Sequence, residues 1–450
     1  MPIRRVLVAN RGEIAVRVIR TCEKLGLETV LCVSEADRAS KGADMATKAV
    51  CIGPAQPAKS YLAVETIVQA ALGYACDAIH PGYGFLSERA DLAKLAEEGG
   101  MIFIGPTARQ IESVGDKLRA RGEAIAADVP VVPGGPVDTP EGAQGLAAEI
   151  GAPLLVKAVG GGGGRGMKLV EDLGDLAATM DLASAEAGAA FGDARVYLER
   201  YVEKGRHIEV QLLGDGEGRV VHLGERDCSV QRRYQKLVEE SPAPHLPADT
   251  RARLLEAAVR FAERLDYRGA GTVEFLFDVE RDEFYFLEMN ARIQVEHPVT
   301  EMVAGTDLVA HQIAIADGRG LSLSQDEVEL EGAAIEVRIN AEDPDNNFMP
   351  SPGTVTDVRW PEGDGIRVDT HIESGSSIPP FYDAMIAKII AWGPDRATAL
   401  ARLRRALDET HIEGIATNLV FQRHILADPD FAQGGVDTGF LARMMEKEPA

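Results

Sequence analysis

Long uncharged apolar runs are missing from this chain of 450 residues. No stretch approaches the roughly 18 apolar residues that a membrane-spanning helix needs. The segment from Met1 to Val6 soon gives way to the polar run Asn10-Arg11-Gly12-Glu13, and it lacks the apolar core of a signal peptide. The sequence therefore predicts a cytoplasmic protein that is not inserted in a membrane.

Basic residues are too few to balance the acidic ones. The chain has 47 Lys and Arg against 71 Asp and Glu, which gives a formal net charge of −24. A field of this sign repels nucleic acid and anionic membrane surfaces, so neither is expected as a partner. If the substrates are anions, local clusters of Lys and Arg must oppose the overall field.

Cysteine is scarce and irregularly spaced. The five cysteines form no Cys-x-x-Cys pair and have no zinc-type spacing, which fits a reducing compartment. Free cysteine commonly packs as a small apolar side chain. We therefore expect all five to be buried: Cys22, Cys32, Cys51, Cys76 and Cys228.

Several nucleotide-binding signatures are absent, but one glycine run stands out. The chain has no Gly-Lys-Ser/Thr phosphate loop and no His-Arg-Asp or Asp-Phe-Gly, which argues against a protein kinase. Residues 160–164 are all glycine and lie between the strand-like runs 154–157 and 167–170. The dinucleotide fingerprint requires a helix after the loop, whereas a strand is expected here. A hairpin whose tip closes over a nucleotide fits better than a merely flexible surface loop, since ordering five glycines is costly.

The distribution of elements predicts about three domains. Strand-like and helical segments alternate over residues 1–112, which indicates a parallel, doubly wound α/β domain. The Pro-rich stretch 130–140 marks a boundary, followed by a small Gly-rich α+β segment at about 131–203 within a domain spanning 113–330. A last unit is expected at 331–447, with a strand near 334–339 and a helix at 396–408.

The segment 288–298 carries the densest chemistry. A strand-like run leads into it, and alternate residues of a strand share a face, so Glu288, Asn290 and Arg292 project together. The first two offer hard oxygen ligands for Mg²⁺, and the third offers a planar fork for an oxyanion. Gln294 and Glu296 continue the set if the extended backbone continues. This pattern indicates phosphoryl transfer to an anionic acceptor, and the alternative is a solvated polar edge strand.

Other charged residues support an anion site. Glu274 precedes a short polar link, so a hairpin would place it opposite Glu288, where two carboxylates repel unless a cation lies between them. Lys157 ends an apolar run beside the glycines, and Lys117 follows Gly115-Asp116. The basic run within residues 225–236 opposes the net charge, although it could also be a solvated charge run.

These motifs together resemble biotin carboxylase, an ATP-grasp ligase and the first-half enzyme of acyl-CoA carboxylases. The resemblance covers essentially the whole chain, and its motifs lie at 80–88, at Lys157 with the glycine run, and at 225–236, 288–298 and 336–342. It implies a three-domain ATP-grasp architecture of mixed α/β and α+β type with a Gly-rich mobile lid. It also implies that ATP phosphorylates bicarbonate to carboxyphosphate, after which biotin is carboxylated.

The resemblance also implies roles for individual residues. The implied ATP contacts are Lys117, Lys157, Gly163, Gly164, Glu199, Arg200, Tyr201, Val202, His207, Tyr234, Glu274 and Glu288. The implied ligands of Mg²⁺ or Mn²⁺ are Glu274, Glu288 and Asn290, and the implied bicarbonate contacts are Lys236, Arg292, Gln294 and Val295. Glu296 is implied as the base and Arg338 as the group that stabilises the biotin enolate, with Tyr83, Gly84 and Phe85 lining the biotin pocket.

Two features qualify the resemblance. Tyr234 stands where this family commonly has a nucleotide-contacting His, and Ala291 replaces a common Thr. The chain has no Ala-Met-Lys-Met sequence of the kind that accepts biotin, so a separate biotin carboxyl carrier protein and carboxyltransferase subunits are expected as partners. A homodimer is expected as well. The resemblance favours an acetyl-CoA carboxylase that forms malonyl-CoA for fatty acid biosynthesis, and the alternative is a propionyl-CoA, methylcrotonyl-CoA or pyruvate-type carboxylase.

Two further readings remain open. One is an ATP-grasp ligase of another substrate, which would share the lid and the metal ligands but need not have the 80–88 motif. The other is a catalytically silent nucleotide-binding subunit, against which the intact Glu288, Asn290, Arg292, Glu296 and Arg338 argue.

Overall fold

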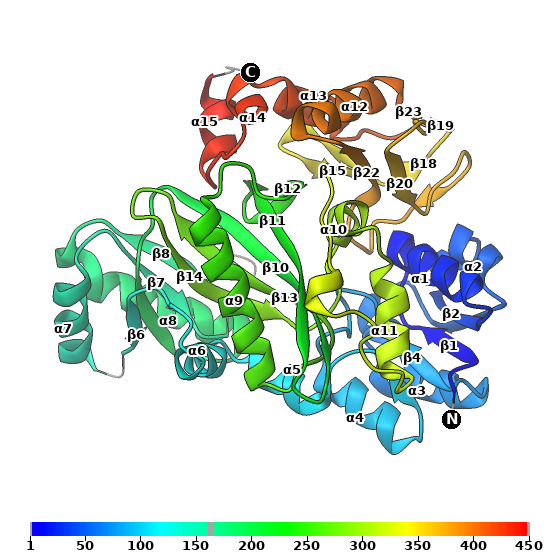
Figure 1. The fold of residues 1–450 in the computed structure, drawn as a ribbon, viewed down its shortest axis with the longest axis horizontal. Coiled ribbons are helices and arrows are strands. Elements are labelled where there is room, and N and C mark those ends of the chain that lie inside the picture. The colour runs from blue at the N-terminus through cyan, green and yellow to red at the C-terminus, as the bar shows by residue number, and fades with distance from the viewer. Residues whose placement is uncertain (1, 138, 161–165, 448–450) are drawn as a thin grey trace.

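The computed structural model describes residues 2–137, 139–160 and 166–447. Figure 1 shows a mixed helix-and-sheet molecule in which a large central sheet lies between the N-terminal layer and a small lobe that contains α7 and α8. The C-terminal helices gather around the far end of the large sheet.

Residues 2–111 form a parallel sheet with the strand order β3-β2-β1-β4-β5. Alternate residues of β1 enter different cores: Val6 and Val8 pack with the α1 side chains, whereas Leu7 packs with those of α3 and α4. Helices therefore cover both faces, which confirms the doubly wound prediction. The strands are β1 (Arg5–Val8), β2 (Glu28–Ser34), β3 (Lys48–Gly53), β4 (Ala78–His80) and β5 (Ile102–Phe103), and the helices are α1 (Gly12–Lys24), α2 (Lys41–Met45), α3 (Val64–Gly73), α4 (Ala90–Glu98) and α5 (Ala108–Gly115).

A small lobe follows helix α6 (Lys117–Ala126) and has its own apolar core, built around Leu154, Val156 and Leu198. In its described part the strand order is β6-β9-β7-β8, and β7 and β8 are antiparallel partners on either side of the glycine run. This pairing confirms that the glycines join two strands of a hairpin. The elements are β6 (Gly134–Pro136), α7 (Pro140–Ile150), β7 (Leu154–Ala158), β8 (Met167–Val170), α8 (Leu176–Phe191) and β9 (Val196–Arg200).

The large sheet, all of whose strands are described, is antiparallel with the order β14-β13-β10-β11-β12-β15-β22-β20. Strand β15 pairs with the edge of β12, so the C-terminal strands extend the same sheet rather than forming a separate layer. The strands are β10 (Gly205–Asp215), β11 (Val220–Arg232), β12 (Gln235–Ser241), β13 (Arg268–Asp278), β14 (Glu283–Asn290), β15 (Ala333–Asn340), β20 (Ile366–Thr370) and β22 (Met385–Gly393).

The helices around this sheet are amphipathic and bury one face. α9 buries Leu254, Ala258 and Phe261, and α12 buries Leu400 and Leu403. The helices are α9 (Ala248–Arg264), α10 (His297–Ala304), α11 (Leu308–Ala316), α12 (Arg396–Glu409), α13 (Leu419–Ala427), α14 (Pro429–Gln433) and α15 (Phe440–Lys447). Short two-stranded pairs complete this part of the chain: β16 (Glu342–Asp343) with β17 (Met349–Pro350), β18 (Gly353–Thr354) with β21 (Ser377–Ile378), and β19 (Asp357–Arg359) with β23 (His411–Glu413).

Two expectations need correction. Cys51 is exposed, so the burial predicted for all five cysteines holds only for the other four. Strand β14 ends at Asn290, and the backbone then turns into helix α10 rather than remaining extended to residue 296. None of the helices within the described residues is both long and apolar enough to cross a membrane.

Candidate active site

A row of charged side chains crosses the large sheet. In the strand register, Glu288 on β14 lies opposite Glu274 on β13, which lies opposite Glu209 on β10, which in turn lies opposite Arg226 on β11. Direct cross-strand partners share one face of a sheet. The predicted hairpin therefore does place Glu274 opposite Glu288, and the neighbouring strand adds a third carboxylate.

Lys236 on β12 is the cation that these carboxylates share. Its Nζ lies 2.6 Å from Glu209 Oε2, 2.9 Å from Glu274 Oε1 and 2.6 Å from Glu296 Oε1. Burial lowers the pKa of Lys236, but the three carboxylates more than offset this and raise it well above its usual value. The ammonium is thus a fixed positive charge that faces the strand row and Glu296 together.

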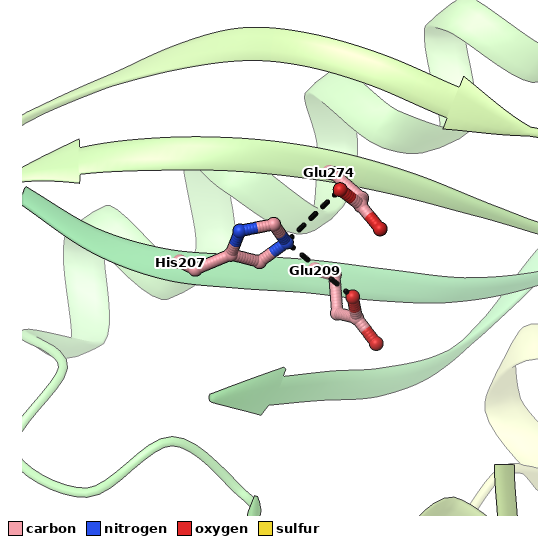
Figure 2. A group of neighbouring side chains, drawn as sticks. All are labelled: His207, Glu209 and Glu274. Carbon is pink, nitrogen blue, oxygen red and sulfur yellow. Dashed lines mark ion pairs between the residues drawn. The ribbon is translucent and has the colours of Figure 1, made fainter. Parts of the chain in front are cut away.

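His207 lies beside the same carboxylates, as Figure 2 shows, with its Nε2 3.0 Å from Glu274 Oε2 and 3.6 Å from Glu209 Oε2. Burial lowers the pKa of His207, but the Glu274 and Glu209 carboxylates together outweigh burial and raise it to about 9. The imidazole is therefore a second cation at neutral pH in this set of side chains.

Glu296 immediately precedes helix α10 and is buried. Lys236 Nζ holds one of its carboxylate oxygens, and Arg338 Nη2 on β15 donates to the other at 3.0 Å. Burial raises the pKa of Glu296, but Lys236 first and then Arg338 outweigh burial and hold the pKa below its usual value. A carboxylate kept ionised between two cations can accept a proton only from an acid that the same cations strengthen.

The loop between β14 and α10 brings the other residues predicted to contact an anion next to the row of charged side chains on the large sheet. Gln294 Nε2 donates to Glu274 Oε1 at 2.7 Å and its Oε1 accepts from Arg226 Nη2 at 2.7 Å. Arg292 Nε donates to Glu88 Oε2 at 3.0 Å, and its Nη2 donates to Asn290 Oδ1 at 2.7 Å. The side chains predicted to bind an anion are thus held in place by carboxylate and amide oxygens.

The predicted metal ligands are hard oxygens, and their arrangement fits a divalent cation. Burial and then the nearby Glu274 raise the pKa of Glu288, which shows that two negative charges here are costly without a cation. Asn290 Nδ2 also lies 2.9 Å from Glu274 Oε1, so the amide adjoins the same pair. The ligand-like groups His207, Glu209 and Glu274 gather within 4.8 Å of one another, but the Lys236 ammonium bonds to two of them. Glu274 is one of those two, so a Mg²⁺ ion held by Glu274, Glu288 and Asn290 would share the Glu274 carboxylate with Lys236.

The lysines predicted to meet phosphate lie on the lobe side of this row. Lys157 Nζ on β7 lies 2.5 Å from Glu199 Oε2 on β9. Lys117 begins α6, and its pKa is lowered by burial and by Lys157, against the opposing charges of Glu288 and Glu199. Lys117 thus interacts electrostatically with both Lys157 and Glu288, although the three residues are far apart in the sequence.

Other predicted nucleotide contacts are less enclosed or point elsewhere. Tyr234 is 59% exposed at the turn between β11 and β12, with a left-handed φ of 66°. The Arg200 side chain contacts the Tyr285 hydroxyl at the opposite end of β14. Val202 is buried and Tyr201 is half-buried. Gly163 and Gly164 lie outside the described residues.

Comparison with known proteins agrees with this geometry. Residues 2–111 match the biotin carboxylase N-terminal domain, 116–324 the carbamoyl-phosphate synthase L chain ATP-binding domain, and 336–443 the biotin carboxylase C-terminal domain. Biotin carboxylase from Nostoc sp. is 50% identical over 99% of this chain and 100% of its own length. The chain belongs to the biotin carboxylase family. Members of this family are ATP-dependent ligases, and the chain is an enzyme of that class.

The chain is also similar to parts of other carboxylases. The alpha subunit of mitochondrial methylcrotonoyl-CoA carboxylase from Mus musculus is 48% identical over 98% of this chain and 62% of that subunit. The biotin carboxylase domain dimer of 2-oxoglutarate carboxylase from Hydrogenobacter thermophilus, solved with MgADP, ADP and bicarbonate, has a TM-score of 0.94. That domain is 45% identical, with 100% of both chains covered. Similarity to these structures confirms the ATP-grasp fold of biotin carboxylases.

Of the residues predicted for a biotin pocket, Tyr83 adjoins Arg338. Tyr83 donates its hydroxyl proton to Glu13, and Asn10 Nδ2 holds the Tyr83 carbonyl oxygen at 2.7 Å. Gly84 and Phe85 both have a left-handed φ, 66° and 42°, and Phe85 stacks on Tyr61 at 5.0 Å between ring centroids. Burial and the Glu13 carboxylate raise the pKa of Tyr83 and the Arg338 charge opposes them, so the turn after β4 and the end of β15 adjoin.

Several residues of this biotin carboxylase site were not identified from the sequence. Lys388 Nζ on β22 donates to the Val295 carbonyl oxygen at 2.7 Å and lies 3.2 Å from Glu13 Oε1. Glu88 holds Arg292 and also accepts from the Ala291 backbone N–H. Glu88 belongs to the 80–88 motif, which could have identified it, whereas no local pattern singles out Lys388 on its apolar strand.

Proposed function

We propose that this enzyme uses ATP and bicarbonate to carboxylate biotin carried on a separate carrier protein. The observation that carries the proposal is Glu296, a buried carboxylate between the Lys236 ammonium and the Arg338 guanidinium. A base fixed between one cation for bicarbonate and one cation for biotin suits a reaction in which both substrates become anionic.

In the first step, Lys236, Arg292, Gln294 and the Val295 backbone hold bicarbonate, and Glu296 takes its proton. The bicarbonate O–H bond breaks, the electron pair stays on that oxygen, and the oxygen attacks the γ-phosphorus of ATP as ADP leaves. When bound by Glu274, Glu288 and Asn290, Mg²⁺ or Mn²⁺ supplies positive charge to the phosphate oxygens. Lys117, Lys157, Gly163, Gly164, His207, Tyr234 and the stretch from Glu199 to Val202 are the proposed ATP contacts.

In the second step, carboxyphosphate breaks down to CO₂ and phosphate, the phosphate takes the proton from the biotin ring N–H, and the electron pair left on the nitrogen forms the bond to the carbon of CO₂. We assign Arg338 to the negative charge that develops on the ureido oxygen, and Tyr83, Gly84 and Phe85 to the pocket wall. The lobe at 131–203 serves as a lid, because water must be kept from the reactive intermediate.

We also propose the domain division of the enzyme, its oligomeric state, its compartment and its partner subunits. The matches to the family models support division into an N-terminal domain at 1–112, an ATP-grasp domain at 113–330 and a C-terminal domain at 331–447. The Hydrogenobacter dimer supports a homodimer. We propose a cytoplasmic enzyme that works with a carrier protein and carboxyltransferase subunits in an acetyl-CoA carboxylase. Relatives that belong to other carboxylases support the alternative of a different acyl or keto-acid acceptor.

The test is ADP release measured with and without bicarbonate and with and without free biotin. The proposed function predicts ATPase activity that requires bicarbonate and is stimulated by biotin, together with transfer of labelled bicarbonate to biotin. ADP release that is indifferent to bicarbonate would indicate another ATP-grasp ligase. No ADP release with any of these substrates would indicate a silent nucleotide-binding subunit.

A further inference from the structure

Arg338 forms ion pairs with two buried carboxylates that lie in different parts of the chain. Its Nε and Nη2 both lie 2.6 Å from Glu239 Oε1 on β12, and Nη2 also lies 3.0 Å from Glu296 Oε2. A guanidinium carries five N–H donors in a rigid fork, so it can keep one partner while it exchanges another. Glu239 has no substrate role in the proposed function.

Glu239 has a near twin that provides a comparison. Glu336 on β15 is its direct cross-strand partner, and both side chains are fully buried. Among the described residues neither oxygen of Glu336 has a hydrogen-bond partner, whereas Glu239 Oε1 is bound by Arg338. Two carboxyls of the same chemistry thus lie side by side in the same sheet, and only one of them holds the arginine.

We propose that Glu239 is a positioning residue that keeps Arg338 in place when Glu296 becomes protonated, so that the arm released from Glu296 turns to the biotin ureido oxygen. This inference rests on the proposed function. It links the two half-reactions: Arg338 is tied to the base before bicarbonate loses its proton and is freed from the base afterwards.

The proton balance is simple. The bicarbonate O–H bond breaks, an O–H bond forms on Glu296, and the electron pair stays on the bicarbonate oxygen. Glu296 then loses its negative charge, so its ion pair with Arg338 weakens to a neutral hydrogen bond. Without Glu239, protonation of Glu296 would leave Arg338 with no carboxylate of this pair as an anionic partner. The Arg338 side chain, which is 16% exposed, would then not be held in place.

The charges around Glu239 make this anchor depend on pH. Burial raises the pKa of Glu239 and Arg338 lowers it, with Glu296 opposing Arg338, and the pKa lies at about 7. Lys236 on the same strand, Glu336 on the facing strand and the Cys228 thiol on β11 also interact with it. Burial raises the pKa of Glu336 well above its usual value, against the opposing charge of Lys388, so burial disfavours the anionic form of this carboxyl.

The experiment compares Glu239→Gln with Glu336→Gln, two isosteric changes at adjacent buried positions. Bicarbonate-dependent ATPase without biotin and carboxylation of free biotin are measured across pH. Losing the charged partner of Arg338 should lower kcat for biotin carboxylation roughly 10- to 100-fold in Glu239→Gln. The ATPase without biotin should stay within about threefold, and the inflection near pH 7 in the carboxylation profile should disappear. Glu336→Gln should keep both activities and the inflection.

Equal loss of both activities in Glu239→Gln, or equal behaviour of the two variants, would overturn the inference. If Glu239→Gln does not fold, Arg338→Ala is compared with Arg338→Ala/Glu239→Gln, in which no buried charge of the pair is left alone. The inference predicts equal carboxylation in these two, and a further loss in the double variant would contradict it. The proposed function fails separately, when the unmodified enzyme shows no biotin-dependent carboxylation.

Discussion

Glu274 on β13 and Glu288 on β14 lie directly opposite one another in an antiparallel pair. An extra residue in β14 shifts the register between Phe286 and Glu288, and this shift brings the second carboxylate to face the first. The pKa of Glu288 is raised by burial and by Glu274, so ionisation of both carboxyls is unfavourable without a cation between them. This relationship is the structural basis for the proposed metal site.

Glu288→Gln should lower bicarbonate-dependent ATP cleavage by at least about 100-fold, because it removes an anionic ligand from a phosphate-bridging cation. The fold should persist, since the change also removes a buried repulsion. Glu283→Gln, on the exposed end of the same strand, is the matched control and should retain activity. Near-normal turnover of Glu288→Gln with Mg²⁺ would exclude the assignment of residues 288–290.

ATP binding should slow hydrogen exchange in the lobe at 131–203. The amides of β7 and β8 flank the glycine run, and phosphate contacts at its tip would order both strands. Helix α9, which packs against the large sheet, serves as the internal reference and should exchange equally with and without nucleotide. Unchanged exchange in β7 and β8 would leave the glycine run as an ordinary loop.

Tyr234→His should alter nucleotide affinity and little else. The residue is exposed and has a left-handed φ of 66°, which His tolerates better than most residues. Because one hydrogen bond contributes about 1 kcal/mol, the KM for ATP should change less than about tenfold, with the KM for bicarbonate unchanged. A change in the bicarbonate KM instead would show that the turn acts on the anion site.

Acid should destabilise the contact between the N-terminal and C-terminal parts through His371. Burial lowers the pKa of His371 to about 3, and His371 lines a small cavity with Arg11 and Asp37. The unfolded chain takes up a proton below pH 6.5 and the folded chain does not, so stability is lost as the pH falls from 6.5 to about 3, by at most about 1.4 kcal/mol per pH unit. Thermal melting across this range should show a shallower pH dependence for His371→Gln than for the unmodified protein. Parallel curves would remove His371 from the explanation.

Local features of the fold and site were predictable because they depend on neighbouring residues. The hairpin around the glycines and the Glu274–Glu288 pair follow from strands joined by short links, and both are confirmed. The three partners of Lys236 and the Glu239–Arg338 contact were not predictable from local pattern. They depend on the pairing of β12 with β15, which lie about ninety residues apart, and on a loop that leaves the extended conformation after Asn290. Chemistry-bearing residues were therefore recognised individually, whereas their mutual geometry required the structure.

The central claim is that one buried base serves bicarbonate and one shared arginine serves biotin. Arg338→Ala and Glu296→Ala, assayed side by side with and without free biotin, test it most directly. Removing a preorganised charge-stabilising donor typically costs ~10²–10³ in rate. The account predicts that Arg338→Ala loses biotin carboxylation on this scale while it keeps much of the slow bicarbonate-dependent ATPase, and that Glu296→Ala loses both activities. If Arg338→Ala loses the ATPase as completely as Glu296→Ala, the division of roles between the two residues is wrong.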